Sequence, residues 1–188
     1  MKGKLIIFSA PSGAGKTTIV KQMLDLELNL EFSISACTRE KRFNEINGKD
    51  YYFISVQEFK KKIKENEFIE WEEVYEGVFY GTLKSEINRI TDKGKNVVFD
   101  IDVKGGINIK NLYKDDALSI FVMPPSIKHL EERLKNRSTD SLETIKKRLR
   151  KAELELQYAD RFDRVIINDN LEKAVKEAKN TILEFLEK

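Results

Sequence analysis

Ser9-Ala10-Pro11-Ser12-Gly13-Ala14-Gly15-Lys16-Thr17-Thr18 fits the phosphate-binding pattern G-x-x-x-x-G-K-[ST] at every fixed position but the first, where Ala10 replaces glycine. The apolar run of residues 5–8 in front of it predicts a buried strand, and a helical pattern begins near Lys16. A chance glycine-rich turn before a helix is the alternative. The agreement of strand, loop, Lys-Thr pair and helix disfavours it. We therefore predict a phosphate-binding loop after the first strand.

The residues of this loop offer the groups that a nucleoside triphosphate requires. Gly13 and Gly15 let backbone N–H groups turn inward around phosphate oxygens, at a helix N-terminus that carries positive partial charge. We expect Lys16 to bridge the β- and γ-phosphates as a catalytic residue, and Thr17 to offer its hydroxyl to Mg²⁺. The predicted ATP-binding residues of the loop are Ala10, Pro11, Ser12, Gly13, Ala14, Gly15, Lys16, Thr17 and Thr18.

A second candidate ligand for Mg²⁺ is Asp100, within the apolar run of residues 97–102. A carboxylate at the end of an apolar strand has the form of a Walker B motif, and it can reach the metal directly or through water. The alternative for such an aspartate is to cap the following helix, and Asp102 is the better candidate for that role. Spacing alone does not separate the two aspartates.

Composition limits the remaining function classes. The 188 residues suit one domain, and a formal net charge of +2 gives no chain-wide basic field for nucleic acid. Cys37 is the single cysteine and forms no internal disulfide, and neither it nor His129 has metal-ligand spacing. No apolar stretch approaches the length of a membrane span. We expect a cytoplasmic protein that binds neither nucleic acid nor membrane.

Strand-like apolar runs alternate with helical patterns along much of the chain. The runs are residues 5–9, 97–102, 118–123 and 164–168. This alternation predicts an α/β fold with a parallel sheet flanked by helices. Together with the phosphate-binding loop, it predicts a sheet of the P-loop NTPase type.

Two regions depart from the alternation. Between about residues 32 and 82, β-rich segments at 51–54 and 68–75 and the turn signals Asn47-Gly48 and Glu76-Gly77 predict a small inserted lobe. Within it, Ser55 and Glu58 resemble a capping box before a helix. In the second region, from about residue 125 to 160, apolar residues at three- and four-residue spacing predict one face of a long helix; they are Leu142, Ile145, Leu149, Ala152, Leu156 and Ala159.

Several segments, in this order, also carry a resemblance to a known family. They are residues 9–17, 32–35 with 38–42, 47–51, 67–71, 80–82 and 99–102. Over nearly its whole length the chain resembles the guanylate kinase family of nucleoside monophosphate kinases. The resemblance implies one domain with a core of residues 1–32, 83–124 and 161–188, a GMP-binding lobe of about 33–82, and a helical lid of about 125–160.

The predicted lobe offers donors that suit a monophosphate. Arg39 and Arg42 present fork-shaped guanidinium groups that fit a phosphate dianion, and Tyr51 and Tyr80 add neutral hydroxyl donors. Each has an ordinary alternative, such as a half-buried strand aromatic for either tyrosine. Their joint occurrence behind a phosphate-binding loop favours the binding role, and Arg39 is also predicted to be catalytic.

Guanine presents adjacent N–H donors on its Watson–Crick edge, and one carboxylate can accept both. The resemblance assigns this contact to Glu70, which could otherwise be a solvated strand residue, and it assigns a second carboxylate near the base to Asp102. It also implies hydroxyl contacts from Ser35 and Thr82. The predicted GMP-binding residues are Ser35, Arg39, Arg42, Tyr51, Glu70, Tyr80, Thr82 and Asp102.

The charged run of residues 129–140, followed by 147–149, resembles the mobile lid of the family, whose arginines reach over ATP. Arg133 and Arg137 are the predicted ATP contacts, and Arg137 and Arg148 are predicted to be catalytic. A solvated helix face is the alternative, which we expect for the neighbouring lysines. Asn168 is a further candidate, for a contact to adenine.

These features imply that the γ-phosphoryl group of ATP passes to GMP and dGMP with Mg²⁺ as cofactor, giving ADP and GDP in purine nucleotide metabolism and GMP recycling. The partners are then nucleotides, and the chain is a monomer or a small homo-oligomer. One rival is a P-loop phosphotransferase with another acceptor, against which Glu70, Ser35 and Thr82 argue. The other is a guanylate-kinase-like interaction module that binds phosphorylated peptides, against which an intact Lys16 argues.

Overall fold

The computed structural model describes residues 3–136 and 141–188, and their contacts divide the chain into two compact units. The β-rich unit comprises the residues up to Lys4 and Glu31–Val97, and the P-loop unit comprises Leu5–Leu30 and Val98–Lys188. In chain order the elements are β1 (Leu5–Ser9), α1 (Lys16–Leu24), β2 (Leu30–Phe32), β3 (Ala36–Cys37), β4 (Tyr52–Phe53), α2 (Val56–Lys64), β5 (Phe68–Tyr75), β6 (Val78–Leu83), α3 (Lys84–Thr91), β7 (Asn96–Asp100), α4 (Val103–Tyr113), η1 (Lys114–Asp116), β8 (Ala117–Met123), α5 (Ile127–Asn136), α6 (Leu142–Leu156), η2 (Ala159–Arg161), β9 (Arg164–Ile167) and α7 (Leu171–Leu186).

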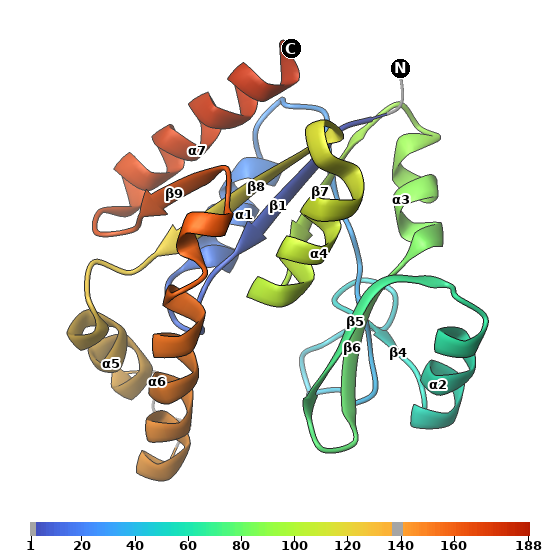
Figure 1. Ribbon diagram of the computed structural model, residues 1–188, viewed down its shortest axis with the longest axis horizontal. Coiled ribbons are helices and arrows are strands. Elements are labelled where there is room, and N and C mark those ends of the chain that lie inside the picture. Colours follow the sequence, from blue (N-terminus) through green and yellow to red (C-terminus); the bar gives the residue numbers. More distant parts are fainter. Residues whose placement is uncertain (1–2, 137–140) are drawn as a thin grey trace. The chain divides into compact units, whose positions relative to one another are not determined.

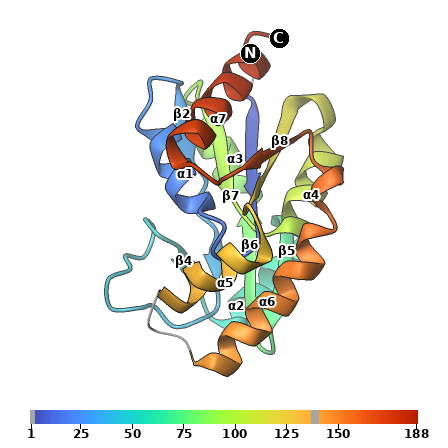
Figure 2. The same cartoon turned by 90° about the vertical axis from the view of Figure 1, so that its left-hand side faces the viewer.

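A five-stranded sheet has the strand order β2-β7-β1-β8-β9, and β8 pairs in parallel with both β1 and β9. Every residue of β1 is buried, as expected of a parallel strand covered on both faces. Helices α1 and α7 cover one face of β1 and β8, and α4 covers the other (Figures 1 and 2). The predicted parallel α/β sheet is confirmed, and the four predicted strands match β1, β7, β8 and β9 to within two residues at each end.

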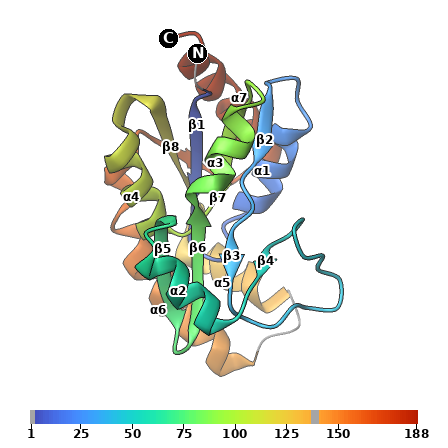
Figure 3. The ribbon, with the colours of Figure 1, turned by 90° about the vertical axis from the view of Figure 1, so that its right-hand side faces the viewer.

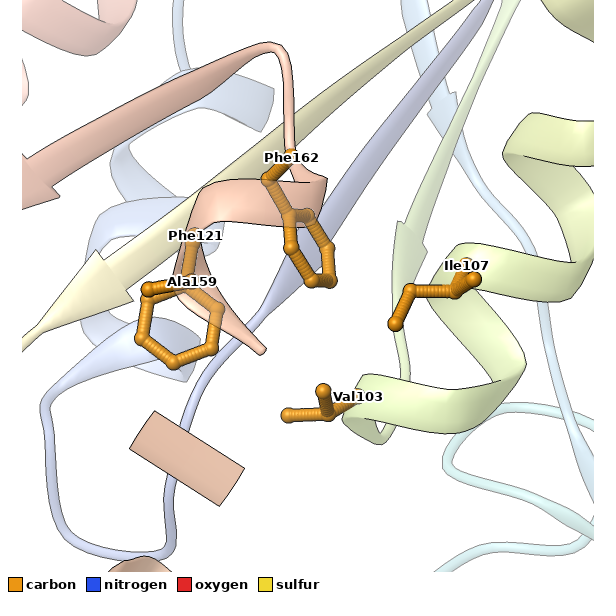
Figure 4. Close-up of a cluster of buried hydrophobic side chains, with 5 residues drawn as sticks. All are labelled: Val103, Ile107, Phe121, Ala159 and Phe162. Carbon is orange, nitrogen blue, oxygen red and sulfur yellow. The ribbon is translucent and has the colours of Figure 1, made fainter. Parts of the chain in front are cut away.

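One core cluster fixes α4 against this sheet (Figure 4). Val103 and Ile107 of α4 pack with Phe121 of β8 and with Ala159 and Phe162, which follow α6. The two phenylalanine rings meet edge to face, with centroids 5.3 Å apart. Such pairs stabilise a core beyond the apolar area they bury. The N-terminal turn of α4, which follows the carboxyl end of β7, is therefore held firmly in place.

The apolar stripe predicted for one long helix serves two different clusters. Ile145 and Ala152 pack against α5, beside which α6 lies, whereas Leu156 packs toward the cluster around Phe121. The helix ends at Leu156, and Ala159 lies in the 3₁₀ turn η2. The prediction that one helix continues to Ala159 was wrong, because the last apolar residues of the stripe pack on other elements than the first.

The β-rich unit contains a four-stranded sheet of order β4-β3-β6-β5 (Figure 3). β5 and β6 form an antiparallel hairpin whose turn contains Gly77 at φ 73°, as the turn signal predicted. Phe59 of α2 stacks on Phe68 of β5, with ring centroids 4.3 Å apart. The Ser55 side chain accepts a hydrogen bond from the Glu58 backbone N–H and caps α2, which confirms the predicted cap.

A buried carboxylate fastens α3 to the strands of the same unit. Glu86 is 2% exposed and accepts hydrogen bonds from the Ile34 backbone N–H, the Tyr52 hydroxyl and Arg89. Burial alone would raise the pKa of Glu86, but these donors outweigh it and lower the pKa. The network holds the chain at Ile34, immediately before the candidate residue Ser35. Within the described parts of the chain, no helix is both long and apolar enough to cross a membrane.

Candidate functional site

The predicted phosphate-binding loop has the backbone geometry that its sequence implies. Gly13 and Gly15 adopt φ values of 95° and 94°, in the left-handed region that side chains other than glycine disfavour. Gly15 is the N-cap of α1, which begins at Lys16. Ala14 is fully buried and its N–H donates to the carbonyl of Pro11 at 3.1 Å, which tightens the loop. The loop thus directs the N-terminus of α1 at the space where an anion would bind.

Three predicted functional residues of the P-loop unit meet in one cluster. The ammonium group of Lys16 lies 2.7 Å from Asp100 Oδ1 and donates to the carbonyl of Ile101 at 2.5 Å. The hydroxyl of Thr17 donates to Asp100 Oδ2 at 2.7 Å. The carboxylate at the end of β7 therefore contacts both side chains that the loop contributes.

The oxygen atoms of this cluster fit a magnesium ion. The Thr17 hydroxyl and the Asp100 carboxylate are hard oxygen donors, which Mg²⁺ prefers over nitrogen or sulfur. Residues 3–136 and 141–188 contain no group of three or more His, Cys, Asp or Glu side chains that could hold a metal ion. A site with few protein ligands suits an ion that keeps several waters and binds phosphate oxygens.

Asp102 caps the next helix. Its carboxylate accepts a hydrogen bond from the Gly105 backbone N–H at 2.9 Å, and its carbonyl accepts one from the Ser9 hydroxyl at 3.0 Å. The alternative considered for the two aspartates is thus observed: Asp100 contacts the loop and Asp102 is the N-cap of α4. Its predicted contact to guanine stays a prediction.

An open cavity of about 430 Å³ lies beside the loop. Gly13, Gly15 and Thr18 line it together with Arg133 and Asn136 of α5 and with Asn168, which follows β9. Asp169 and Leu171 complete its lining, so its walls combine charges of both signs, amide groups, an apolar side chain and the start of α1.

The predicted lid arginines have different surroundings. Arg133 donates to the carbonyl of Ala14 at 3.2 Å and to that of Asn168 at 2.8 Å, so it contacts the loop itself. Arg148 lies on α6, and Arg137 lies outside the described residues. Among the predicted arginines that the structure describes, Arg133 donates a hydrogen bond to the loop.

In the β-rich unit the predicted phosphate-binding residues gather around Arg39. Its Nε donates to the Tyr80 hydroxyl at 3.1 Å, and its guanidinium carbon lies 5.0 Å from the centroid of the Tyr51 ring. The rings of Tyr51 and Tyr80 meet edge to face at 5.9 Å. Arg42 is exposed in the loop that follows. Arg39, Tyr51 and Tyr80 come from distant parts of the chain, and the fold unites them.

Glu45 is a member of this group that the sequence analysis missed. It binds Arg39 through both carboxylate oxygens, at 2.5 and 2.6 Å, and it also accepts the Arg42 backbone N–H at 2.8 Å. Hydrogen bonds from Arg39 are the main reason that the pKa of Glu45 falls to about 2 and that the pKa of Arg39 rises. No short motif marks this pairing, because it depends on the turn in which the Glu45 N–H returns to the carbonyl of Arg42.

The predicted guanine-contacting residues Glu70 and Thr82 face each other across the β5–β6 hairpin. They are direct cross-strand partners, and the Thr82 hydroxyl donates to Glu70 Oε1 at 2.8 Å. The exposed fractions of the two residues are 7% and 0%, so the Glu70 carboxyl group is buried beside the Thr82 hydroxyl. A guanine presents two adjacent N–H groups on its Watson–Crick edge, and one carboxylate can accept both.

Side chains alternate between the two faces of β6, which explains how Tyr80 and Thr82 can both take part in the contacts described above. Residues two apart point to the same face of a strand, so Tyr80 and Thr82 share a face. Gly81 lies between them because a Cβ there would come within 2.8 Å of both the Glu70 carbonyl and the Trp71 side chain. Ser35 directly precedes β3, whose Ala36 pairs with Gly81. Ser35, Tyr80 and Thr82 are therefore close in the sheet.

Comparisons with known proteins identify the family of the chain. The sequence profile of the family described as guanylate kinase matches residues 2–185. A guanylate kinase from Porphyromonas gingivalis is 53% identical over 186 residues, which cover 98% of this chain and 99% of that protein. The chain belongs to the guanylate kinase family.

Further relatives support the assignment to the guanylate kinase family. A guanylate kinase from Bacteroides thetaiotaomicron is 54% identical over 188 residues, covering all of this chain and 92% of that protein. Among solved structures, a guanylate kinase from Anaplasma phagocytophilum superposes with a TM-score of 0.77 at 30% identity, covering 97% of this chain and 85% of that one. Both sequence and fold are therefore those of guanylate kinases, and the predicted family and enzyme class are confirmed.

Proposed function

We propose that this member of the guanylate kinase family transfers the γ-phosphoryl group of ATP to GMP and dGMP, giving ADP and GDP. The observation that carries the choice of acceptor is the buried Glu70–Thr82 pair, with a hydrogen bond of 2.8 Å. Adenine would place a ring nitrogen acceptor against this carboxylate, whereas guanine places N–H donors there. A site that accepts hydrogen bonds from its substrate discriminates against an analogue that lacks the matching donors.

The P-loop unit is proposed to bind ATP. The N–H groups at the start of α1, from Gly15 to Thr17, would cradle the phosphates, and Lys16 would exchange its contacts with Asp100 and Ile101 for phosphate oxygens. Thr17 and Asp100 would hold Mg²⁺, which neutralises phosphate charge when bound. Arg133 extends the positive charge along the cavity beside the loop.

The β-rich unit is proposed to bind GMP. Arg39 and Arg42 are proposed to donate guanidinium N–H groups to the monophosphate, and Tyr51 and Tyr80 to donate their hydroxyls, while Glu70, Ser35 and Thr82 contact the base. None of these proposed contacts involves the 2′-position of the ribose. For this reason dGMP is included as an acceptor. Asp102 is proposed as a second carboxylate for the base, in addition to its capping role.

The transfer itself requires little covalent chemistry from the protein. A phosphate oxygen of GMP attacks the γ-phosphorus in line, a new P–O bond forms, and the bond to the bridging oxygen of ADP breaks. Lys16 and Arg39 neutralise the charge that spreads over the transferring group, and Arg137 and Arg148 are proposed to do so from the lid of residues 125–160. Exclusion of water by the lid would prevent hydrolysis of ATP.

The test is a coupled assay of ADP formation with Mg·ATP and, in turn, GMP, dGMP, AMP, CMP and UMP. Turnover confined to GMP and dGMP is the expected result. Turnover with another acceptor would keep the P-loop assignment and remove Glu70 from its role in recognition. Folded protein that binds GMP without any turnover would favour the interaction module. We further propose a cytoplasmic location and a role in purine nucleotide metabolism, because the proposed ligands of both sites are soluble nucleotides.

A further inference from the structure

The fully buried carbonyl of Ala14 in the phosphate-binding loop accepts two hydrogen bonds from outside the loop. The Asn168 side-chain amide donates to it at 2.7 Å, and Arg133 donates to it at 3.2 Å. Arg133 also donates to the backbone carbonyl of Asn168 at 2.8 Å. The three residues belong to α5, to the end of β9 and to the loop, and all lie in the P-loop unit.

These contacts determine the orientation of one peptide group. In a trans peptide the C=O and N–H bonds point in opposite directions, and the carbonyl of Ala14 shares its peptide group with the N–H of Gly15. Because Asn168 and Arg133 hold the carbonyl outward, the Gly15 N–H points to the opposite side, into the loop where phosphate is proposed to bind. Without the two donors, this peptide could rotate, since the glycine that follows it has wide conformational freedom.

The packing around Asn168 shows that its position is closely constrained. Its side chain is 5% exposed, and its backbone N–H donates to the carbonyl of Met123 at 2.8 Å. A Cβ built on Gly15 would overlap the amide nitrogen of Asn168. Since the carbonyl of Ala14 can only accept hydrogen bonds, the nitrogen end of the Asn168 amide must face it. Glycine at position 15 is therefore required by this contact as well as by its φ of 94°.

We infer that Asn168 is a positioning residue for the phosphate-binding loop, which acts through the Ala14–Gly15 peptide and fixes an N–H donor for the triphosphate. This differs from the adenine contact that the sequence suggested for Asn168, and it rests on the proposed binding of ATP by the loop. The two roles predict different ligand dependence. A residue that orients a phosphate donor affects every polyphosphate, whereas a residue that contacts adenine affects only ligands with that base.

The experiment is a set of equilibrium titrations of wild type and Asn168→Ala with Mg·ATP, with inorganic tripolyphosphate and with GMP. The loss of one oriented hydrogen bond is expected to weaken Mg·ATP and tripolyphosphate by the same factor, about tenfold. GMP binding is expected to stay within a factor of about two, the scatter of such measurements. Asn168→Ser keeps a small polar side chain that is too short to reach Ala14, and it should repeat this pattern if the alanine variant folds poorly.

A matched control is Asn170→Ala. Asn170 has the same side chain two positions further on, and it caps α7 by accepting the Lys173 N–H at 3.0 Å. Loss of that cap lowers the melting temperature but should leave both polyphosphates bound as in wild type.

Four outcomes would overturn the inference: a loss for ATP without a loss for tripolyphosphate, an equal loss for GMP, the same selective loss in Asn170→Ala, or no loss at all. Wild type that binds neither ATP nor tripolyphosphate would contradict the proposed function itself. The failure of the inference and that of the proposed function are therefore distinguishable.

Discussion

The phosphate-binding loop and the Arg39 group are both suited to phosphate, but they are built differently. In the loop the donors are backbone N–H groups, and their direction follows from glycine φ values and from contacts to the Ala14 carbonyl. Around Arg39 the donors are side chains, and their direction follows from Glu45, Tyr80 and the ring of Tyr51. A backbone donor is kept under any substitution except by proline, whereas a side-chain donor is lost when its residue is replaced. Substitutions therefore remove donors directly from the Arg39 group, whereas they affect the backbone donors of the loop through the residues that orient them.

The largest expected effect is that of Lys16, the cationic side chain that the loop itself contributes. Lys16→Ala removes the cation proposed for the β- and γ-phosphates, and we expect kcat to fall by about a thousandfold, as when an oriented electrostatic group is lost. The measurement is ADP formation at saturating ATP and GMP. Lys21→Ala, on an exposed turn of the same helix α1, is the control and should keep its turnover. Near-native turnover of Lys16→Ala would contradict the assignment.

The next effect concerns the buried carboxylate of the β-rich unit. Glu70→Gln keeps an acceptor for Thr82 but removes the charge and one acceptor, so GMP affinity should fall by about ten- to a hundredfold. ATP affinity should not change. Calorimetric titration with each nucleotide gives both constants. Glu76→Ala, in the exposed hairpin turn, is the control. Equal losses of affinity for GMP and ATP would show that Glu70 supports the fold and does not contact the guanine base.

A smaller effect sharpens the contrast between the two phosphate sites. Glu45→Gln replaces the charged partner of Arg39 by a neutral one, and the guanidinium is then held less firmly against Tyr80. We expect GMP affinity to fall by about tenfold, the loss of one charge-assisted hydrogen bond. ATP binding should stay unchanged. Tighter binding of GMP in this variant would mean that the Glu45 carboxylate competes with the phosphate, and the positioning role would be wrong.

The smallest expected effect is on the stability of the fold in acid, and its sign differs between the two units. Salt bridges and hydrogen bonds from Lys93, Lys95 and Arg89 outweigh burial and lower the pKa of Glu31 to about 2. A lowered pKa stabilises the fold above the ordinary pKa of the carboxyl, and this contribution is lost as the pH falls from about 4.5 toward 2.

Glu31→Gln should therefore lower the melting temperature at pH 7 by roughly 2–4 °C, for a network of about 1 kcal/mol. The difference from wild type should vanish near pH 2. Thermal denaturation followed by circular dichroism at several pH values gives the comparison. A difference that is independent of pH would show that the charge of Glu31 is irrelevant. In the P-loop unit burial raises the pKa of Glu155, so its contribution has the opposite sign.

Sequence predicts the loop better than the Arg39 group because the loop is contiguous. Its glycines, Lys16 and Thr17 lie within one short stretch, so one pattern shows both the backbone and the chemistry. Tyr80 lies 41 residues from Arg39, and Ala14 lies 119 residues from Arg133. Such pairings follow from the tertiary fold, and neither periodicity nor composition indicates them.

Short and composite elements escaped prediction for similar reasons. β3 has two residues, Ala36 and Cys37, too few for any periodic pattern. The stripe that ends at Ala159 has helical spacing throughout, but its parts pack on different elements. In the sequence, only its negative charge marks Glu45 as a possible partner of Arg39. The same loop contains other acidic residues, so the charge alone does not single it out.

The position of Trp71 gives the chain a built-in optical probe. It is the only tryptophan in the sequence, it follows Glu70 on β5, and it is 45% exposed. Indole emission depends on local polarity, so a change in fluorescence on adding GMP would come from the β-rich unit alone. The occupancy of the proposed acceptor site could then be followed in real time while ATP is present, without a label and without a substitution.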